Sequence, residues 1–145
     1  MKQLKLGKCG RHLVGNNQFT HLQVASGYSF KYGTSQPHQL VERAAQYGMS
    51  ALALTDRNGM PGAIRFSKAC EEFGITPILG VNLSFIQKRY RVTLLAQKGK
   101  LSSLYRLLSA VNMDNKENVL TLDLLKRFSC YSRDVLVMLD LWLAL

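Results

Sequence analysis

Ala51-Leu-Ala-Leu-Thr-Asp56 is the stretch that decides the fold class, because it is a short apolar run that ends in a carboxylate. Continuous apolar runs of this length are typical of buried strands in parallel sheets. A helical pattern precedes it, with Ser35 as the expected N-cap and Gly48 as the stop, and a second one follows over residues 63–73. A buried strand between two helices predicts an α/β protein.

The rest of the chain continues this alternation. We expect further strands at residues 19–25, 76–85, 90–96 and 135–139, a helix over residues 101–111, and a short helix from Thr121 to Leu125. The strands at 76–85 and 90–96 are placed to pair with each other across residues 87–89. The full order predicts an α/β domain with mainly parallel strands.

Length and composition limit the class of protein. The chain has 145 residues, which fits one domain or part of one, and its apolar share of 47% excludes a disordered protein. Three cysteines (Cys9, Cys70 and Cys130) lie far apart, which argues against a disulfide framework and a structural zinc site, and indicates a reduced cytoplasm. The apolar run at residues 135–145 contains Asp140 and is shorter than the about 20 residues that a membrane span needs.

The positive charge is concentrated in two places. Nineteen Lys and Arg against nine Asp and Glu give a net charge of +10. Residues 1–18 are expected to form a basic, flexible leader. No acidic residue stands between Glu72 and Asp114, where six cations form candidate nucleic-acid contacts: Lys88, Arg89, Arg91, Lys98, Lys100 and Arg106. A basic stretch of this kind is either a solvated surface or a binder of a phosphate backbone.

Candidate chemistry lies where strands end, because functional groups of α/β folds gather at the carboxyl ends of strands. His21 and Gln23 are expected on one face of the first strand. Asp56 is either a metal ligand or base, or a structural group neutralised by Arg57. Cys70 falls on the inner face of its helix, as a buried apolar residue would. The sequence has no phosphate-binding or dinucleotide-binding glycine pattern.

Several ordered stretches resemble one known family. Phe19-Thr-His-Leu-Gln-Val-Ala-Ser-Gly-Tyr-Ser29 resembles the first motif of the PHP (polymerase and histidinol phosphatase) family, as found at the N-terminus of bacterial DNA polymerase III alpha subunits. The stretch Gly48-Met-Ser-Ala-Leu-Ala-Leu-Thr-Asp56 is similar to the second motif. The resemblance covers residues 19–139. It implies an incomplete (β/α)7 barrel, in a family whose active members hydrolyse phosphoesters with a metal cluster and whose inactive members are structural.

The resemblance also implies that most metal positions are lost. His21 matches a family ligand, whereas Gln23 and Asn82 stand where the resemblance places a His and a Glu. Tyr32 stands at a carboxylate position, and Arg57 replaces the His of the motif that contains Asp56. We therefore expect a degenerate, metal-free site with no catalytic residues. Zinc, manganese or magnesium would be the cofactor only if the chain were a stand-alone PHP phosphoesterase.

The resemblance leads to an expected function. The chain resembles the N-terminal PHP segment of a DNA-directed DNA polymerase (a nucleotidyltransferase) in DNA replication, but lacks the polymerase carboxylates, so whether it is itself an enzyme stays open. The expected partners are the rest of an alpha subunit, replisome proteins and DNA, in the cytoplasm and without a membrane. Residues 140–145 are an apolar tail unlike the family, which suggests a truncated domain. The alternatives are a stand-alone phosphoesterase and a module that binds DNA or a protein partner.

Overall fold

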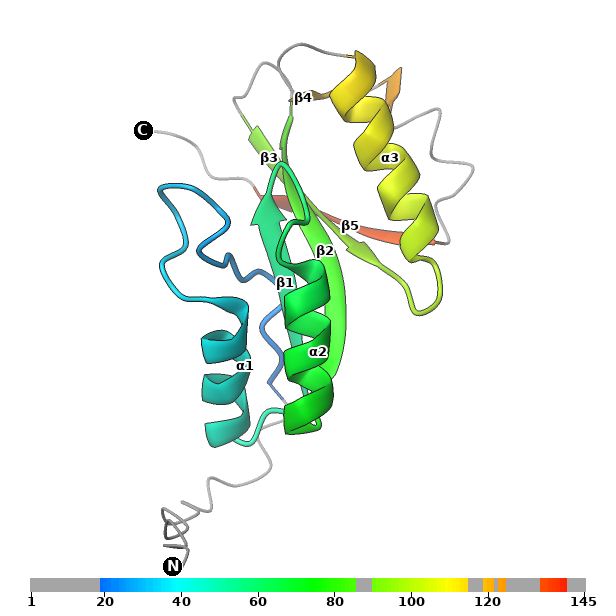
Figure 1. Ribbon diagram of the computed structural model, residues 1–145. Helices are drawn as coiled ribbons and strands as arrows, with labels where there is room; N and C mark the ends of the chain where they lie inside the picture. Colours follow the sequence, from blue (N-terminus) through cyan, green and yellow to red (C-terminus); the bar gives the residue numbers. More distant parts are fainter. Residues whose placement is uncertain (1–18, 86–89, 115–118, 122, 125–133, 141–145) are drawn as a thin grey trace, which may run out of the picture.

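The computed structural model describes residues 19–85, 90–114, 119–121, 123–124 and 134–140 (Figure 1). Over residues 37–114 the helices and strands follow the predicted order, whereas the short strand at residues 119–120 was not predicted. They are α1 (Pro37–Gln46), β1 (Ala51–Arg57), α2 (Ala63–Phe73), β2 (Thr76–Phe85), β3 (Tyr90–Ala96), α3 (Leu101–Asp114), β4 (Val119–Leu120) and β5 (Val135–Asp140). The expected leader at residues 1–18 and most of the expected tail, residues 141–145, lie outside the described residues.

The strands form one mixed sheet in the order β1-β2-β3-β5, and β4 pairs with the end of β2. The β1–β2 and β2–β4 pairs are parallel, whereas the β2–β3 and β3–β5 pairs are antiparallel. The expected pairing of residues 76–85 with 90–96 is confirmed. The expectation of a mainly parallel sheet was wrong, because β3 turns straight back from β2 and β5 then aligns against β3. The α/β class itself is confirmed.

The helices pack against one face of the sheet (Figure 1). Leu54 of β1 and Phe66 of α2 share one core with residues of α1, and Val81 of β2 packs with Leu104 of α3 in a second core. Asp56 follows Leu54 on the same side of β1 and is in register with Val81, so both cores lie on this face. The opposite face at the carboxyl end of β1 is polar.

Residues 19–25 do not form the regular strand that the alternation predicts. The His21 carbonyl accepts a hydrogen bond from the Ala53 amide, and the Val24 carbonyl accepts one from the Thr55 amide. Three residues of this segment therefore match two residues of β1, as in a bulge, and the Val24 amide donates to the Thr55 hydroxyl instead of a carbonyl. This extra residue breaks the period of two on which the prediction for His21 and Gln23 depended.

The helix ends follow local chemistry. The N-cap of α1 is Gln36 and not Ser35, because Pro37 takes the first helical position, where its missing amide costs nothing. The Gln39 side chain accepts a hydrogen bond of 2.9 Å from the Gln36 amide. At the other ends, Gly48 and Gly74 adopt φ of 70° and 69°, which glycine tolerates. Gly48 thus stops α1 as predicted, and Gly74 stops α2.

Later elements agree with the sequence where they are described. The predicted helix at residues 101–111 is present and extends to Asp114, and β5 extends one residue beyond the predicted 135–139. Thr121 accepts a hydrogen bond from the Leu124 amide, as an N-cap does, and residues 123–124 are helical, whereas residues 122 and 125 lie outside the described residues. None of the helices described here is long and apolar enough to cross a membrane.

Candidate functional site

Asp56 ties a loop to the end of β1. Its carboxylate is 1% exposed and accepts hydrogen bonds from the Ser26 amide (2.7 Å), the Ser26 hydroxyl (2.9 Å) and the Ser29 hydroxyl (2.7 Å). A buried carboxylate with several donors is well satisfied as an anion. The geometry favours a structural role for Asp56, because the carboxylate faces the helix side of the sheet and holds residues 26–33 in place. The expected neutralisation by Arg57 was wrong, because successive residues of a strand point to opposite faces and the partners of Asp56 are serines.

Arg57 lies on the opposite face from Asp56 and stacks on Tyr32. Its guanidinium lies over the Tyr32 ring, and its backbone amide donates a 3.0 Å hydrogen bond to the Ser29 hydroxyl. Arg57 is half-buried, whereas Tyr32 is 60% exposed. Stacking of this kind fixes the plane of a guanidinium and leaves its edge available to donate hydrogen bonds. The structure thus brings two of the predicted site residues, Tyr32 and Arg57, into contact.

Asn82 is held by Arg91 on the same face as Arg57. Arg57 and Asn82 are partners in the parallel β1–β2 register, so their side chains share a face. The Asn82 side chain accepts a hydrogen bond from Nε of Arg91 and donates one of 2.7 Å to the Thr93 hydroxyl. Asn82 and Thr93 are 4% and 0% exposed. The predicted site residue Asn82 is therefore part of a buried polar network.

Arg91 is held by several acceptors at once. Its Nη1 donates to the Ser84 hydroxyl (3.1 Å), and its Nη2 donates to the Asn82 carbonyl (2.7 Å) and to Oδ1 of Asn58 (3.4 Å). Asn58 has a φ of 54° and donates its own amide to the Asn82 carbonyl over 2.9 Å. These contacts place Arg91 inside the site, although the sequence suggested it only as a nucleic-acid contact.

The structure separates His21 from these residues. His21 lines a cavity of about 260 Å³ beside α1, where its neighbours include Arg43, Tyr47, Met49 and Leu52. Its backbone lies next to Ala53, four residues before Arg57, which corresponds to about 13 Å along a strand. Gln23 is exposed. Of the site residues expected from the family resemblance, Tyr32, Arg57 and Asn82 thus lie together, whereas His21 and Asp56 lie on the helix side of the sheet.

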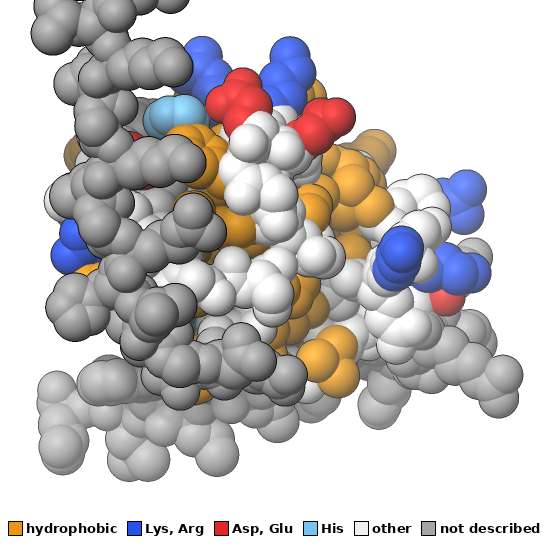
Figure 2. All heavy atoms as spheres, turned by 90° about the horizontal axis from the view of Figure 1, so that it is seen from below, with side chains coloured by type: hydrophobic (Ala, Val, Ile, Leu, Met, Phe, Trp, Pro, Cys, Tyr) orange, Lys and Arg blue, Asp and Glu red, His pale blue; other side chains and the backbone are white. Residues whose placement is uncertain are grey.

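The cations predicted as nucleic-acid contacts also lie in separate parts of the structure. Arg91 is the second residue of β3, and Lys98 follows the end of this strand at Ala96, which is already about 17 Å from Arg91 along the strand. Lys98, Lys100 and Arg106 are exposed, and Lys88 and Arg89 lie outside the described residues. On the face shown in Figure 2, Lys and Arg side chains lie in separate groups with hydrophobic side chains between them. On that face, the positive charge does not form one continuous patch.

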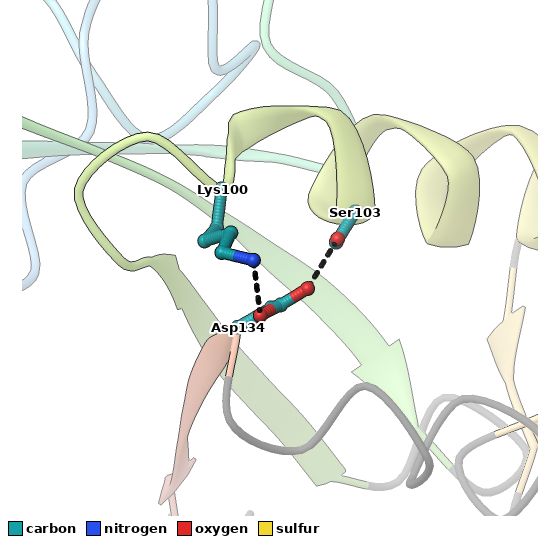
Figure 3. Close-up of polar contacts among 3 residues, drawn as sticks. All are labelled: Lys100, Ser103 and Asp134. Carbon is teal, nitrogen blue, oxygen red and sulfur yellow. Dashed lines mark hydrogen bonds and ion pairs between the residues drawn. The ribbon is translucent and has the colours of Figure 1, made fainter.

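Lys100 has an acidic partner that the local sequence did not suggest. Asp134, just before β5, lies 3.3 Å from Nζ of Lys100 and accepts a 2.8 Å hydrogen bond from the Ser103 hydroxyl of α3 (Figure 3). The Ser103 hydrogen bond, followed by the bond and charge of Lys100, lowers the pKa of Asp134 below its usual 3.8, while burial opposes the shift. These three residues join the start of α3 to the start of β5.

Sequence reasoning missed the polar partners that complete the site: Ser26, Ser29, Asn58, Ser84 and Thr93. One signal was available, because Ser84 and Thr93 alternate with apolar residues in otherwise apolar strands. A buried polar side chain in such a position requires a hydrogen-bond partner. The partners themselves depend on the strand register and were not visible in the sequence.

The donor set at the carboxyl end of β1 does not fit a divalent metal. Among the described residues, no group of three His, Cys, Asp or Glu is placed to hold an ion. The polar face carries the guanidiniums of Arg57 and Arg91, and the oxygens of Asn82 and Ser84 already accept from Arg91. A fixed positive charge repels a cation at such distances. The chemistry of this face therefore suits an anion.

Comparisons with known proteins point to one family. The model of the PHP domain family matches residues 21–139 of the chain. An error-prone DNA polymerase of Symbiobacterium thermophilum is 44% identical over 96 residues, which cover 66% of this chain and 9% of that protein. A DNA polymerase III subunit alpha of Buchnera aphidicola is 36% identical over 105 residues, which cover 72% of this chain and 8% of that protein. The chain thus spans less than a tenth of these two polymerases.

A solved structure is similar in part. It is a two-domain protein of Bacteroides vulgatus, described as containing a predicted PHP-like metal-dependent phosphoesterase. It is 17% identical, with a TM-score of 0.47, over 52% of this chain and 25% of that protein.

Proposed function

The chain belongs to the PHP domain family, and we propose that it is the N-terminal PHP segment of a DNA polymerase III alpha-type subunit, with a structural and non-hydrolytic role. The proposal takes its polymerase context from the relatives, which are named error-prone DNA polymerase and DNA polymerase III subunit alpha. In this role the chain works in DNA replication in the cytoplasm. Its partners are the remainder of the alpha subunit, other replisome proteins, and DNA.

One observation carries the non-hydrolytic part of this proposal: the polar face at the carboxyl end of β1 is held together by Arg91. Its guanidinium bonds Asn82 and Ser84 of β2 and Asn58 after β1, so a protein cation connects these strand ends. A bound metal would need free, negatively charged oxygens there, since hard divalent ions prefer carboxylates and carbonyls. Arg91 therefore supplies internally the positive charge that a metal would bring.

The arrangement of helices and sheet supports the proposal that this chain is part of a larger barrel. The described helices cover one face of the sheet, and the other face carries the buried polar residues Asn82 and Thr93 (Figure 1). A (β/α)7 barrel has this division, with helices outside and the second face turned inward. We propose that the chain contributes the first strands and helices of such a barrel.

The test is metal analysis of the purified full chain together with an assay for hydrolysis. The chain is dialysed against zinc, manganese and magnesium in turn, and bound metal is measured. Hydrolysis is then followed with a phosphomonoester and with a 3′-labelled oligonucleotide. We expect no stoichiometric metal and no turnover. Stoichiometric zinc or manganese together with turnover that is lost in His21→Ala would overturn the proposal in favour of the phosphoesterase.

A further inference from the structure

We propose that the cavity beside α1, which His21 helps to line, binds a small carboxylate with an apolar body such as a phenyl or a branched alkyl group. The cavity lies at the start of β1, at the opposite end of this strand from Asp56 and Arg57. The inference therefore goes beyond the proposed function and does not depend on it.

The walls of the cavity are apolar, and its volume is small. The end of α1, the start of β1 and residues 21–24 surround about 260 Å³. An apolar cavity of about 150 Å³ holds a benzene molecule, so this cavity has room for a benzene ring and a short polar group. The hydrophobic residues among its described lining are Val24, Leu40, Ala44, Met49 and Leu52. Transfer of an apolar ring from water to such walls is favourable.

The polar side of the cavity consists of hydrogen-bond donors. Arg43, Tyr47 and His21 line it, and all three are exposed, so they stand at its mouth. Arginine has donors only, and a neutral imidazole offers one N–H. Among the described residues, no Asp or Glu lines the cavity. These groups therefore complement a ligand that carries a negative charge and acceptor oxygens.

Arg43 is held in place and keeps donors for a ligand. Its Nη1 donates a 3.2 Å hydrogen bond to Oε1 of Gln46, and its Nη2 donates a 2.8 Å hydrogen bond to the Tyr47 hydroxyl. The guanidinium also lies 4.8 Å from the centre of the Tyr47 ring. Since these contacts already restrict the side chain, less conformational entropy is lost when its remaining N–H groups meet a carboxylate.

The charge of Arg43 has no acidic partner in the described part of the chain. Glu42 is its neighbour on α1, but successive residues of a helix point about 100° apart, and Glu42 does not line the cavity. The described ion pairs of His38 and Lys100 involve Glu72 and Asp134, not Arg43. A bound carboxylate therefore gives Arg43 its first ion pair among these groups.

The test uses sodium phenylacetate, which joins a benzene ring to one carboxylate. Phenylacetamide has the same ring without the charge, and sodium acetate has the charge without the ring. Each probe is titrated into the full chain, isotope-labelled at its methionine methyl groups, and the signals are followed by NMR. Met49 lines the cavity and reports binding, and its signal is assigned by its loss in Met49→Leu. Met60 packs against the core that contains α3 and is the internal control.

Three variants test the polar side. Arg43→Gln removes the charge, and Tyr47→Phe removes the hydroxyl that holds Arg43 but keeps the ring. Arg65→Gln is the matched control, because Arg65 is also exposed on a helix, lies 5.9 Å from the centre of the Tyr28 ring and does not line the cavity. Circular dichroism confirms that each variant is folded.

We expect phenylacetate to shift the Met49 signal saturably and to leave the Met60 signal unchanged. Arg43→Gln should weaken this binding about tenfold and Tyr47→Phe by a smaller factor, whereas Arg65→Gln should leave it nearly unchanged. Phenylacetamide and acetate should each bind at least about tenfold more weakly than phenylacetate, because each lacks half of the complementary ligand.

An unmoved Met49 signal, or equal losses in Arg43→Gln and Arg65→Gln, would overturn the inference. Equal affinity for phenylacetamide and phenylacetate would overturn it too, and would indicate a neutral apolar group, such as a side chain of a protein partner, as the occupant. The metal analysis tests the proposed function separately, so failure of one proposal is distinguishable from failure of the other.

Discussion

Arg91 of β3 donates from Nε to the side-chain oxygen of Asn82 of β2, and the same guanidinium reaches the hydroxyl of Ser84 two residues further along β2. An arginine thus takes the buried amide of a neighbouring strand as its partner. Asn82 is 4% exposed, so it depends on protein partners and not on water for its hydrogen bonds.

Replacing Arg91 by methionine tests how much these hydrogen bonds stabilise the fold. Methionine keeps much of the length but no donors, so buried oxygens of Asn82 and Ser84 lose a partner. We expect the free energy of unfolding in urea to fall by about 1–3 kcal/mol. Arg106→Met on the exposed side of α3 is the control and should change it by less than about 0.5 kcal/mol. Equally small changes in the free energy of unfolding of both variants would show that the hydrogen bonds of Arg91 do not stabilise the fold.

Gly33 closes the loop that Asp56 holds. A Cβ at this position would lie 1.9 Å from the carbonyl oxygen of Ser26, which is backbone and cannot move alone. Gly33→Ala should therefore lower the free energy of unfolding by roughly 1–3 kcal/mol. Gly27→Ala in the same loop meets nothing closer than 3.5 Å and should be nearly neutral. Thermal melts of the two variants measure the difference, and comparable melting temperatures would contradict the crowding at Gly33.

Asp134 predicts a loss of stability in acid. Since its pKa is lower in the folded chain than its usual 3.8, the carboxylate stabilises the fold above that pH, and this contribution disappears as the pH falls through the folded pKa. Asp134→Asn should melt below the wild type at pH 7, and by a smaller margin at pH 3. In a Ser103→Ala background the gap at pH 7 should shrink, because the main cause of the shift is gone. A gap of the same size at both pH values would refute this assignment.

Cys70 predicts a loss of stability in base. Burial raises the pKa of its thiol to about 11, so the folded chain keeps the proton over a range in which the unfolded chain has lost it. The stability of the wild type should therefore fall from pH 9 to 11 more steeply than that of Cys70→Ala.

The same thiol should resist alkylation at pH 8 in the folded chain, as peptide mapping by mass spectrometry would show. Rapid labelling of Cys70 in the native chain would contradict its burial.

The elements with local causes could be predicted from the sequence. The bounds of α2 agree with the prediction because an apolar face recurs with helical spacing and Gly74 stops it. The buried run that forms β1 was equally clear. Such features depend on neighbouring residues and on burial, which composition and spacing record directly.

The features that depend on register could not be predicted. Arg91 stands in a run of cations, and only the β2–β3 pairing, which sets it opposite Ser84, makes it part of the site. The bulge between His21 and Val24 depends on the Thr55 hydroxyl, thirty-one residues from Val24. The sequence predicted His21 and Gln23 on one face of a regular strand. The hydrogen bonds to β1 interrupt the alternation there, and their spacing depends on residues far away in the sequence.

The strand pairings around β3 imply an order of folding. β2 and β3 meet through a short connection, from Phe85 to Tyr90, whereas β3 meets β5 only when Val135 returns to Ala96. Closing a longer loop costs more chain entropy and slows the pairing. The β2–β3 hairpin should therefore form early and β5 should dock late. Amide hydrogens of β5 should then exchange with solvent before those of β2 and β3.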